Sequence, residues 1–598
     1  MNRPLQQTWD LDVFFPGGSD SPEFAQYMNA LEADTNRFRS ELDALPSPQT
    51  AEAAAALQSF VERLQDLQKR LRQAAAFIGC LSAQNQADRG AVRLGGRLDG
   101  IQANYQSAMT RFDVLLAEMP DSVFGQWIGS GAMSELAFNL EERRTQVKDK
   151  LPLEQETLAN DLAVDGYHGW SALYDTIVKQ IRLPYEKDGN MVMLSAGQFF
   201  NQLIKEPDRQ KRERLFRQWE EMWTAQEDFC ADALNRIAGF RLQLYKHRGW
   251  DSVIREPLQI NRMTGKTLQT MWEVIEKNKP VFIAYLERVA KLMGVERLAW
   301  SDLNAPFEGK DTNVSYDEAA VMIEEQFRRF SPQLADFTVR AFEERWVEAE
   351  DRPGKRPGGF CTSFPVSKQS RIFMTYSGAG NLSTLAHELG HAFHQHVMNE
   401  LPPMTQRYAM NVAETASTFA ELIVSDAALK QAETRERKLF LLKDKIQRAV
   451  AFFMDIHARF LFETRFYEER KSGLVGPDRL NELMIEAQKD AFCGALSEYH
   501  PHFWAAKLHF YKTGVPFYNF PYTFGFLFSS GIYSLARREG ESFESRYIAL
   551  LQDTGRLTVE QLASKHLGVD LEQPEFWQQA VDLSIEDVKQ FLALTEEG

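Results

Sequence analysis

The chain has 598 residues, of which 44% are hydrophobic and 25% charged, a balance typical of a soluble globular protein built as one large body or as two to four subdomains. Acidic residues outnumber basic ones, the formal net charge is -16, and no dense lysine and arginine stripe occurs, which argues against nucleic acid as a partner. The four cysteines lie far apart without a C-x-x-C pair, so reduced thiols are expected rather than disulfides or a cysteine-ligated zinc site.

The sequence predicts neither a secretory signal nor a membrane span. The first ten residues, M-N-R-P-L-Q-Q-T-W-D, lack the apolar region and cleavage site of a signal peptide, so a cytoplasmic location is expected. No charge occurs from Thr513 to Ala536, but this stretch contains prolines and glycines that would leave backbone groups unpaired in a bilayer. It is predicted to be buried loop and helix, and no membrane partner is expected.

Two long helices are predicted in the N-terminal region. Apolar residues recur at three- and four-residue steps from Leu57 to Ile78 and again from Leu94 to Leu116, and the two helices are expected to pair as an antiparallel hairpin. A shift from a Gln/Ala-rich N-terminal third to an aromatic-rich C-terminal half predicts a domain boundary near residue 200, which separates residues 1–200 from residues 201–598.

The remaining sequence is predominantly α. Helical periodicity continues from Phe199 to Leu244 with an interruption at Glu206-Pro207, and from Leu268 to Leu292 with Pro280 as a potential kink. Between residues 354 and 380, glycines and prolines occur among β-forming residues, which predicts a small sheet.

The sequence T-L-A-H-E-L-G-H-A-F-H, which follows this sheet and has Ser383 as a predicted N-cap, carries a potential metal site. His387 and His391 are one helical turn apart on one face, so both imidazoles can reach a single ion. Glu388 lies about 100° round the helix from His387 and can approach a metal-activated water without being a ligand. This is the arrangement that a general base requires.

A catalytic zinc takes three protein ligands, and the same helix does not supply the third. His394 lies one further turn along, but three ligands in a row on one helix would span about 10 Å, so His394 is expected to make a structural or outer hydrogen bond. Val397 occupies the position of the third histidine of the metzincin pattern, and Glu400 lies about 20 Å from His387 along a continuous helix.

The next predicted helix, from Asn411 toward Lys430, contains two candidate carboxylates. Glu414 and Glu421 are seven residues apart and face the same way among small and apolar neighbours. One can bind the metal while the other orients a ligating histidine through its second ring nitrogen. The spacing leaves open which carboxylate has which role.

These motifs closely resemble the zinc metallopeptidases of the thimet oligopeptidase family, and particularly the oligoendopeptidase F branch. The segments that carry the resemblance are His387-Glu388-Leu389-Gly390-His391, Ala413-Glu414-Thr415-Ala416-Ser417-Thr418-Phe419-Ala420-Glu421, Gly359-Phe360-Cys361-Thr362-Ser363-Phe364, Trp9-Asp10-Leu11 and the aromatic segment near residue 520. The likeness therefore covers most of the chain.

The resemblance implies a site for one Zn2+ per chain. It places the third ligand at Glu414, beside His387 and His391, and makes Glu388 the general base. It also assigns stabilisation of the oxyanion to a C-terminal histidine and tyrosines, which match His509, Tyr518 and Tyr522, and it leaves open which of the two tyrosines donates.

Three further residues are predicted to bind substrate. An exposed strand edge at Gly359 and Phe360 would pair with an extended peptide backbone, and Tyr518 is the other candidate. Phe524-Gly525-Phe526 lacks the hydroxyls that the thimet branch has around the corresponding glycine.

The fold implied by the resemblance is mainly α, with two helical lobes flanking a deep substrate channel and a small β-sheet next to the zinc-binding helix. Residues 1–200 would form part of the channel wall, and residues 201–598 would form the catalytic domain.

The expected function is a zinc-dependent endopeptidase acting on short unfolded oligopeptides in the cytoplasm. A metallo-carboxypeptidase is the alternative, and it would need a basic residue near the site to hold a terminal carboxylate. The sequence does not identify that residue. A third reading is a helical scaffold protein with inert histidines and no bound metal.

Overall fold

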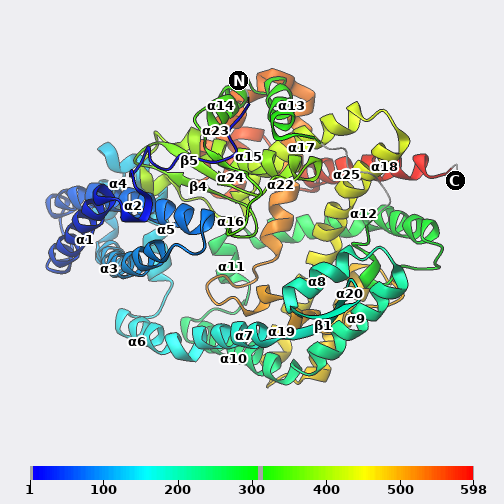
Figure 1. Ribbon diagram of the computed structural model, residues 1–598. Coiled ribbons are helices and arrows are strands. Elements are labelled where there is room, and N and C mark those ends of the chain that lie inside the picture. Colours follow the sequence, from blue (N-terminus) through cyan, green and yellow to red (C-terminus); the bar gives the residue numbers. More distant parts are fainter. Residues whose placement is uncertain (1–3, 307–313, 597–598) are drawn as a thin grey trace. The chain divides into compact units, whose positions relative to one another are not determined.

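The computed structural model describes residues 4–306 and 314–596, which are mainly helical as predicted (Figure 1). The chain packs as two compact units. Unit 1 comprises Met1–Lys150, Asp311–Ala427 and Ile532–Val569, and unit 2 comprises Leu151–Lys310, Ala428–Gly531 and Asp570–Gly598. The predicted boundary near residue 200 falls inside unit 2, and the two lobes flanking a channel stay a prediction.

The N-terminal part of unit 1 is built from three long helices, α1 (Pro22–Asp43), α2 (Ala51–Gln84) and α3 (Arg89–Glu118), which Figure 1 shows side by side in blue. The predicted pairing of two long helices is confirmed, because α2 packs against α3. Each helix begins at a side-chain cap, in which Ser21, Thr50 or Asp88 accepts a backbone N–H from the first turn. Apolar side chains between these helices form a continuous core.

The predicted sheet is present and has three strands in the order β3-β5-β4. Strand β4 (Phe360–Phe364) runs antiparallel to β5 (Gln369–Phe373), and the short β3 (Val347–Glu348) lies parallel to β5 on its other side. The sheet packs against both α2 and α15 (Leu382–Met398), the helix of the histidine motif. Strand β4 therefore forms one edge of a sheet that lies beside the candidate site.

The remaining helices of unit 1 are α4 (Asp121–Ile128), α5 (Ala137–Lys148), α13 (Tyr316–Arg328), α14 (Pro332–Glu343), α16 (Met410–Ala413), α17 (Thr415–Gln431, mostly in this unit), α23 (Glu544–Asp553) and α24 (Val559–Leu567). The predicted N-cap of α15 is wrong. Ser383 is the second residue of the helix, and Asn381 occupies the cap position without a side-chain cap hydrogen bond. A short 3-10 helix, Ala379–Asn381, leads directly into α15, so the cap position lies two residues earlier in the sequence than predicted.

Unit 2 is also helical, and its breaks follow local sequence signals. The periodic stretch from Phe199 to Leu244 folds as three helices, with the predicted interruption at residues 206–208 and a second one at residues 225–226. Pro280 does not divide its helix, which is continuous. The helices are α6 (Leu153–Ala163), α7 (Gly169–Gln180), α8 (Ala196–Lys205), α9 (Arg209–Thr224), α10 (Glu227–Arg248), α11 (Arg255–Ile260), α12 (Gly265–Leu292), α18 (Arg435–Val450), α19 (Ile456–Arg470), α20 (Pro477–Ala491), α21 (Phe503–Ala506), the first part of α22 (Phe520–Glu539) and α25 (Pro574–Leu594). The antiparallel hairpin of β1 (Arg182–Lys187) and β2 (Asn190–Ser195) lies between α7 and α8.

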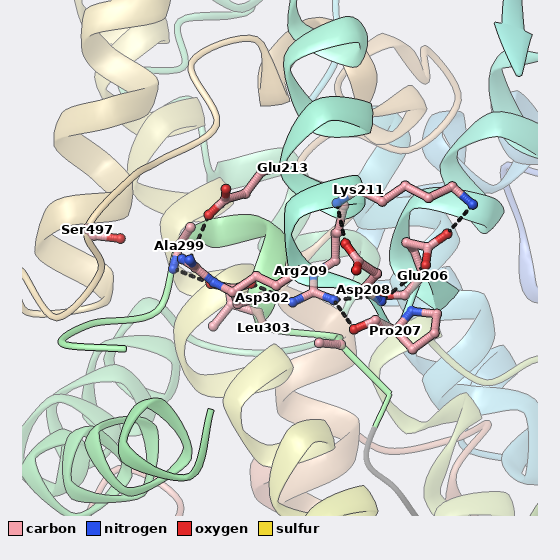
Figure 2. Close-up of polar contacts among 12 residues, drawn as sticks. Glu206, Pro207, Asp208, Arg209, Lys211, Glu213, Ala299, Asp302, Leu303 and Ser497 are labelled. Carbon is pink, nitrogen blue, oxygen red and sulfur yellow. Dashed lines mark hydrogen bonds and ion pairs between the residues drawn. The ribbon is translucent and has the colours of Figure 1, made fainter. Parts of the chain in front are cut away.

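A buried ion pair holds the start of α9 in unit 2. Arg212 donates to Asp302 at 2.7 Å with both side chains fully buried, and Arg209 donates to the other carboxylate oxygen at 3.2 Å. Figure 2 shows Arg209 reaching Asp302 and Lys211 reaching Glu206 on the neighbouring loop. Because Asp302 also accepts the Ala299 backbone N–H, the carboxylate is satisfied on every side and works as a structural anchor.

The uncharged C-terminal stretch is buried as predicted, since Phe524, Leu527 and Phe528 on α22 are fully buried. No helix within the described ranges is long and apolar enough to span a bilayer. All four cysteines are free thiols, as expected from their spacing.

Candidate metal centre

The centre depends on a very close approach of two helices at Gly390. A Cβ atom at this position would lie 2.5 Å from the Ala416 carbonyl oxygen and 2.6 Å from the Ser417 Cα on α17. Any side chain at residue 390 would therefore push the backbones of α15 and α17 apart. This role was not predicted from the sequence, although a glycine between the two motif histidines is a signal of close backbone packing.

Glu414 lies at a break between two helices rather than inside one. It follows α16 and precedes α17, with a backbone conformation that ends the first helix. The Ser417 hydroxyl donates to the Glu414 carboxylate at 2.9 Å and so fixes the carboxylate orientation. Sequence reasoning missed Ser417, whose position three residues after Glu414 is the only signal that could have indicated it.

Three ligand atoms converge at one point between α15 and α17. The Nε2 atoms of His387 and His391 are 3.1 Å apart, and Glu414 Oε2 lies 3.2 Å from the first and 3.4 Å from the second. Ligands of a tetrahedral zinc with bonds of about 2.0–2.1 Å are about 3.3 Å apart. The triangle therefore fits a zinc ion without rearrangement, and it is the one such His/Cys/Asp/Glu group found among residues 4–306 and 314–596.

The electrostatics of the triangle favour a cation. Burial opposes protonation of His387, but hydrogen bonds to Glu414 and Glu421 outweigh it and raise the pKa of this histidine to about 10. Burial works against the charged form of Glu414 as well, yet hydrogen bonds from both histidines hold its pKa well below the usual value. The two carboxylates therefore stabilise positive charge at the position where the ligand atoms meet.

The structure separates the positions of the two carboxylates that the sequence could not distinguish. Glu414 faces His387 Nε2, whereas Glu421 Oε1 lies 3.5 Å from Nδ1 of the same ring. A carboxylate on the second ring nitrogen fixes the tautomer and the orientation of a ligating histidine. The geometry places Glu414 with the ligand atoms and Glu421 behind the ring.

Glu388 lies beside the triangle in a confined space. Its side chain is buried, and burial raises the pKa of its carboxyl, while the positive charge of His391 and His387 lowers it. Within the described residues its Oε2 has no hydrogen-bond partner. Gly359 packs against the other oxygen, because a Cβ at Gly359 would lie only 3.2 Å from Glu388 Oε1. One carboxylate oxygen therefore lies against Gly359, next to β4, while the other has no hydrogen-bond partner among the described residues.

The triangle, Glu388 and the edge strand border one cavity. Its volume is about 420 Å³, and Gly359 and residues Phe360 to Ser363 of β4 line it together with the histidines and Glu414. The structure thus brings the predicted substrate residues Gly359 and Phe360 next to the predicted metal ligands. Three more side chains complete the lining, namely Arg72 from α2, Gln395 from α15 and Tyr408.

Two residues near the motif lie outside the triangle, as expected: His394 makes structural hydrogen bonds, and Glu400 supplies none of the ligand atoms. His394 is fully buried, and its Nε2 lies 2.9 Å from the Thr554 hydroxyl and 3.2 Å from the Leu551 carbonyl oxygen. Burial lowers the pKa of His394 to about 3, so this ring stays neutral. Glu400 is exposed and forms an ion pair with Lys368 at 2.7 Å, away from the triangle.

His509, Tyr518 and Tyr522 belong to unit 2, where they cluster with one another. The ring centroid of His509 lies 5.0 Å from that of Tyr518 and 6.2 Å from that of Tyr522. The structure does not test the oxyanion and substrate roles predicted for these residues, which stay predictions.

A hydrogen-bond chain fixes the tautomer of His509, and sequence reasoning missed its members. Arg459 donates to Asn519 Oδ1 at 3.0 Å, so this atom of the amide must be the oxygen. His509 Nδ1 lies 2.7 Å from the same oxygen and must donate to it. Because burial lowers the pKa of His509 to about 4, the ring is neutral near pH 7 and its Nε2 is an acceptor.

Comparison with known proteins places the chain among peptidases. The family model described as peptidase family M3 matches residues 202–583, and the one described as oligopeptidase F matches residues 116–182. The chain is similar to an oligoendopeptidase F homolog of Lactococcus lactis subsp. lactis (strain IL1403), with 21% identity over 607 residues that cover 99% of this chain and 98% of that protein. The resemblance inferred from the motifs is confirmed.

Solved structures show the same fold over nearly the full length. A putative peptidase from Chlamydophila abortus superposes with a TM-score of 0.82 at 17% identity, covering 98% of both chains. The oligoendopeptidase-F from Enterococcus faecium gives a TM-score of 0.70 at 19% identity, covering 97% of this chain and 100% of that one. At these identities the likeness shows the fold.

Proposed function

The chain belongs to peptidase family M3, a family of metallo-oligopeptidases, and we propose that within it the chain is a zinc-dependent endopeptidase that hydrolyses internal bonds of short unfolded oligopeptides. The observation that carries the proposal is the convergence of His387, His391 and Glu414 beside Glu388 in one cavity. A helical scaffold with inert histidines does not account for three ligand atoms placed at the spacing of a zinc tetrahedron.

In the proposed reaction His387, His391 and Glu414 are the protein ligands, and Glu388 moves the protons. A bound zinc would polarise the scissile carbonyl and lower the pKa of a water molecule. Glu388 takes a proton from the attacking water while the water oxygen bonds to the carbonyl carbon. Glu388 then gives that proton to the amide nitrogen as the C–N bond breaks. The burial of Glu388 supports this role, because the raised pKa that burial causes allows a carboxylate both to accept and to release a proton.

Strand β4 is the proposed binding surface for the peptide backbone. It is an edge strand that lines the cavity, so a substrate can extend the sheet by main-chain hydrogen bonds. Gly359 supports a close approach at the end of the strand nearest Glu388. Recognition through the backbone would accept many sequences.

Tyr522 and His509 are the proposed groups for the oxyanion, with Tyr518 as a substrate contact. The hydroxyl of Tyr522 can donate a hydrogen bond directly. His509 can donate through Nε2 only after it gains a second proton, because Nδ1 holds the first. Tyr522 is therefore the stronger candidate of the two.

The test compares the purified protein with its Glu388→Gln variant on unstructured peptides of graded length, with products identified by mass spectrometry and zinc measured in both proteins. We expect internal cuts that fall by at least ~10²-fold in the variant, while the zinc content stays the same, because Glu388 is not a ligand. Equal cleavage by both proteins would refute the role of Glu388. Release of C-terminal residues alone would favour the carboxypeptidase alternative, which the position of Arg72 in the cavity makes worth testing.

A further inference from the structure

The cavity contains an arginine, Arg72, to which the described part of the chain supplies no acidic partner. Arg72 projects from α2 into the lining, and its Nη2 donates to Gln395 Oε1 at 3.0 Å. Among the described residues no carboxylate forms an ion pair with Arg72. The buried Arg212 differs in this respect, since it pairs with Asp302. Arg371 is fully buried without an ion pair among the described residues, but it donates to the carbonyl oxygens of Asp10 and Ser370.

The surroundings of Arg72 disfavour its charged form overall. Desolvation lowers the pKa of its guanidinium most, Tyr408 and Cys361 raise it by less, and the positive charge of Arg407 lowers it. A guanidinium that stays charged in such a place gains strongly from an incoming anion, because charge-assisted, bidentate hydrogen bonds compensate for the solvation that burial has removed.

Gln395 holds the guanidinium in place. Its Nε2 donates to Gln406 Oε1 at 3.0 Å, which fixes the amide so that its oxygen faces Arg72. Gln395 therefore uses one N–H of Arg72 and leaves the other donors of the guanidinium for a ligand.

Tyr408 adds a second donor at the same end of the cavity. Its ring stacks on His394 with centroids 4.3 Å apart, so its position is fixed by packing. Within the described chain the Tyr408 hydroxyl makes no hydrogen bond, although Tyr408 lines the cavity. Burial raises the pKa of this phenol, and the nearby Arg72 guanidinium lowers it by less, so the hydroxyl keeps its proton. A guanidinium and a phenol that face one space form a suitable site for a carboxylate.

The position of this site along α15 sets its distance from the reaction. Gln395 lies four residues after His391 on the same helix face, which corresponds to about 6 Å along the axis. An extended peptide advances about 3.3–3.6 Å per residue. A carboxylate on Arg72 would therefore lie about one or two residues from the bond that is cut.

We propose that Arg72, assisted by Tyr408, is a specificity-determining residue that binds a carboxylate of the peptide substrate one or two residues from the scissile bond. The carboxylate is either the free C-terminus or the side chain of an aspartate or glutamate. This inference rests on the proposed function. The Arg72 site would determine which peptides the enzyme prefers to cleave.

The test uses three versions of one short peptide that the wild-type enzyme cleaves. The first has a free C-terminus two residues beyond the cut, the second has a C-terminal amide there, and the third has the amide and a glutamate beside the cut. We expect kcat/KM for at least one carboxylate-bearing peptide to exceed that for the neutral amide by about 10- to 100-fold. The first peptide identifies the C-terminus as the source of the carboxylate, and the third identifies a side chain.

Arg72→Met should abolish this preference, and Tyr408→Phe should reduce it by a smaller factor. Arg63→Met is the matched control, because Arg63 lies on the same helix but pairs with Glu41 at the surface, and it should keep the full preference. Equal cleavage of all three peptides by the wild type, or an unchanged preference in a folded Arg72→Met protein, would overturn the inference.

Two further measurements separate this outcome from failure of the proposed function. Zinc content and thermal unfolding show whether Arg72→Met keeps its fold. If it does not, the preference of the wild type among the three peptides and its change in Tyr408→Phe still test the carboxylate site. Loss of the preference with retained cleavage of the amide supports the role of Arg72. Cleavage that survives Glu388→Gln would refute the proposed function instead.

Discussion

Two clusters of histidine and glutamate stand out among the described residues, and they show what distinguishes a candidate metal centre from an ion-pair network. In the first cluster, His387 and His391 turn their Nε2 atoms toward Glu414 so that three ligand atoms meet. The second, in unit 2, contains His500, His502, Glu220 and Glu227. Both clusters have the residue types of a zinc site.

The second cluster differs because the Glu220 carboxylate lies between its two histidines, so their ring nitrogens do not converge on a common point. Glu220 contacts Nδ1 of both His500 and His502, and His502 Nε2 lies 2.9 Å from Glu227. The other nitrogen of His500 accepts a hydrogen bond from the Trp219 indole at 3.3 Å. Every ring nitrogen thus has a protein partner. A metal centre requires ring nitrogens that converge on one point, with no other protein group lying between them.

The largest effect that tests this contrast comes from removing a ligand. His391→Ala should lower bound zinc to below a tenth of the wild-type amount and cut peptidase activity by at least ~10³-fold, because two remaining ligands do not hold a catalytic ion. His502→Ala is the control, and its zinc content should equal that of the wild type. Metal analysis of both purified variants checks the prediction, and a loss of zinc from His502→Ala would show that the contrast is wrong.

The next effect comes from the helix crossing. Gly390→Ala should destabilise the protein by about 3 kcal/mol, because the added methyl group would overlap the α17 backbone. Separation of α15 from α17 should also weaken zinc binding. In the control Gly79→Ala, the new methyl group on α2 meets open space and should stabilise the helix slightly. Thermal unfolding and zinc titration of the two variants measure the difference, and equal stabilities would contradict it.

The second cluster should affect stability without affecting zinc. Burial opposes ionisation of Glu220, but interactions with His500 and His502 lower its pKa to about 2, below the ordinary value of 4.5. Its contribution to stability is therefore present above about pH 4.5 and is lost as the pH falls toward 2. Hydrogen bonds to Glu220 and Glu227 overcome the effect of burial and raise the pKa of His502, so the contribution of this histidine is complete below its ordinary pKa of 6.5 and is lost as the pH rises through the folded-state value.

We expect Glu220→Gln to lower the free energy of unfolding by about 2 kcal/mol near pH 6, and this difference from the wild type should shrink as the pH falls below 4.5. Urea unfolding across this pH range, followed by tryptophan fluorescence, measures it. A difference that does not vary with pH would mean that the ion pair is not its source. Zinc content should be unchanged.

Sequence patterns predicted much of this molecule because they are local. The helix periodicity of α2 and α3, the β-formers of β4 and the four-residue spacing of His387 and His391 all depend on near neighbours along the chain. The contact of α15 with α17, the hydrogen bond from Ser417 and the position of Arg72 depend on packing between segments far apart in sequence. Helix spacing alone could not assign Glu414 and Glu421 for the same reason.

The smallest effect is expected from changing Glu421, which lies on the far side of the His387 ring from Glu414. Glu421 faces His387 Nδ1 at 3.5 Å, and its removal would leave the ring able to bind metal but less well oriented and less basic. Glu421→Gln should therefore weaken zinc binding by roughly tenfold and reduce activity only where zinc is limiting. Glu400→Gln is the control, since Glu400 pairs with Lys368 at the surface and should have no effect. Competition with a chelator measures the affinities. If Glu421→Gln lost zinc as completely as His391→Ala, Glu421 would be a ligand rather than a support, and the division of roles between the two carboxylates on either side of one imidazole would be reversed.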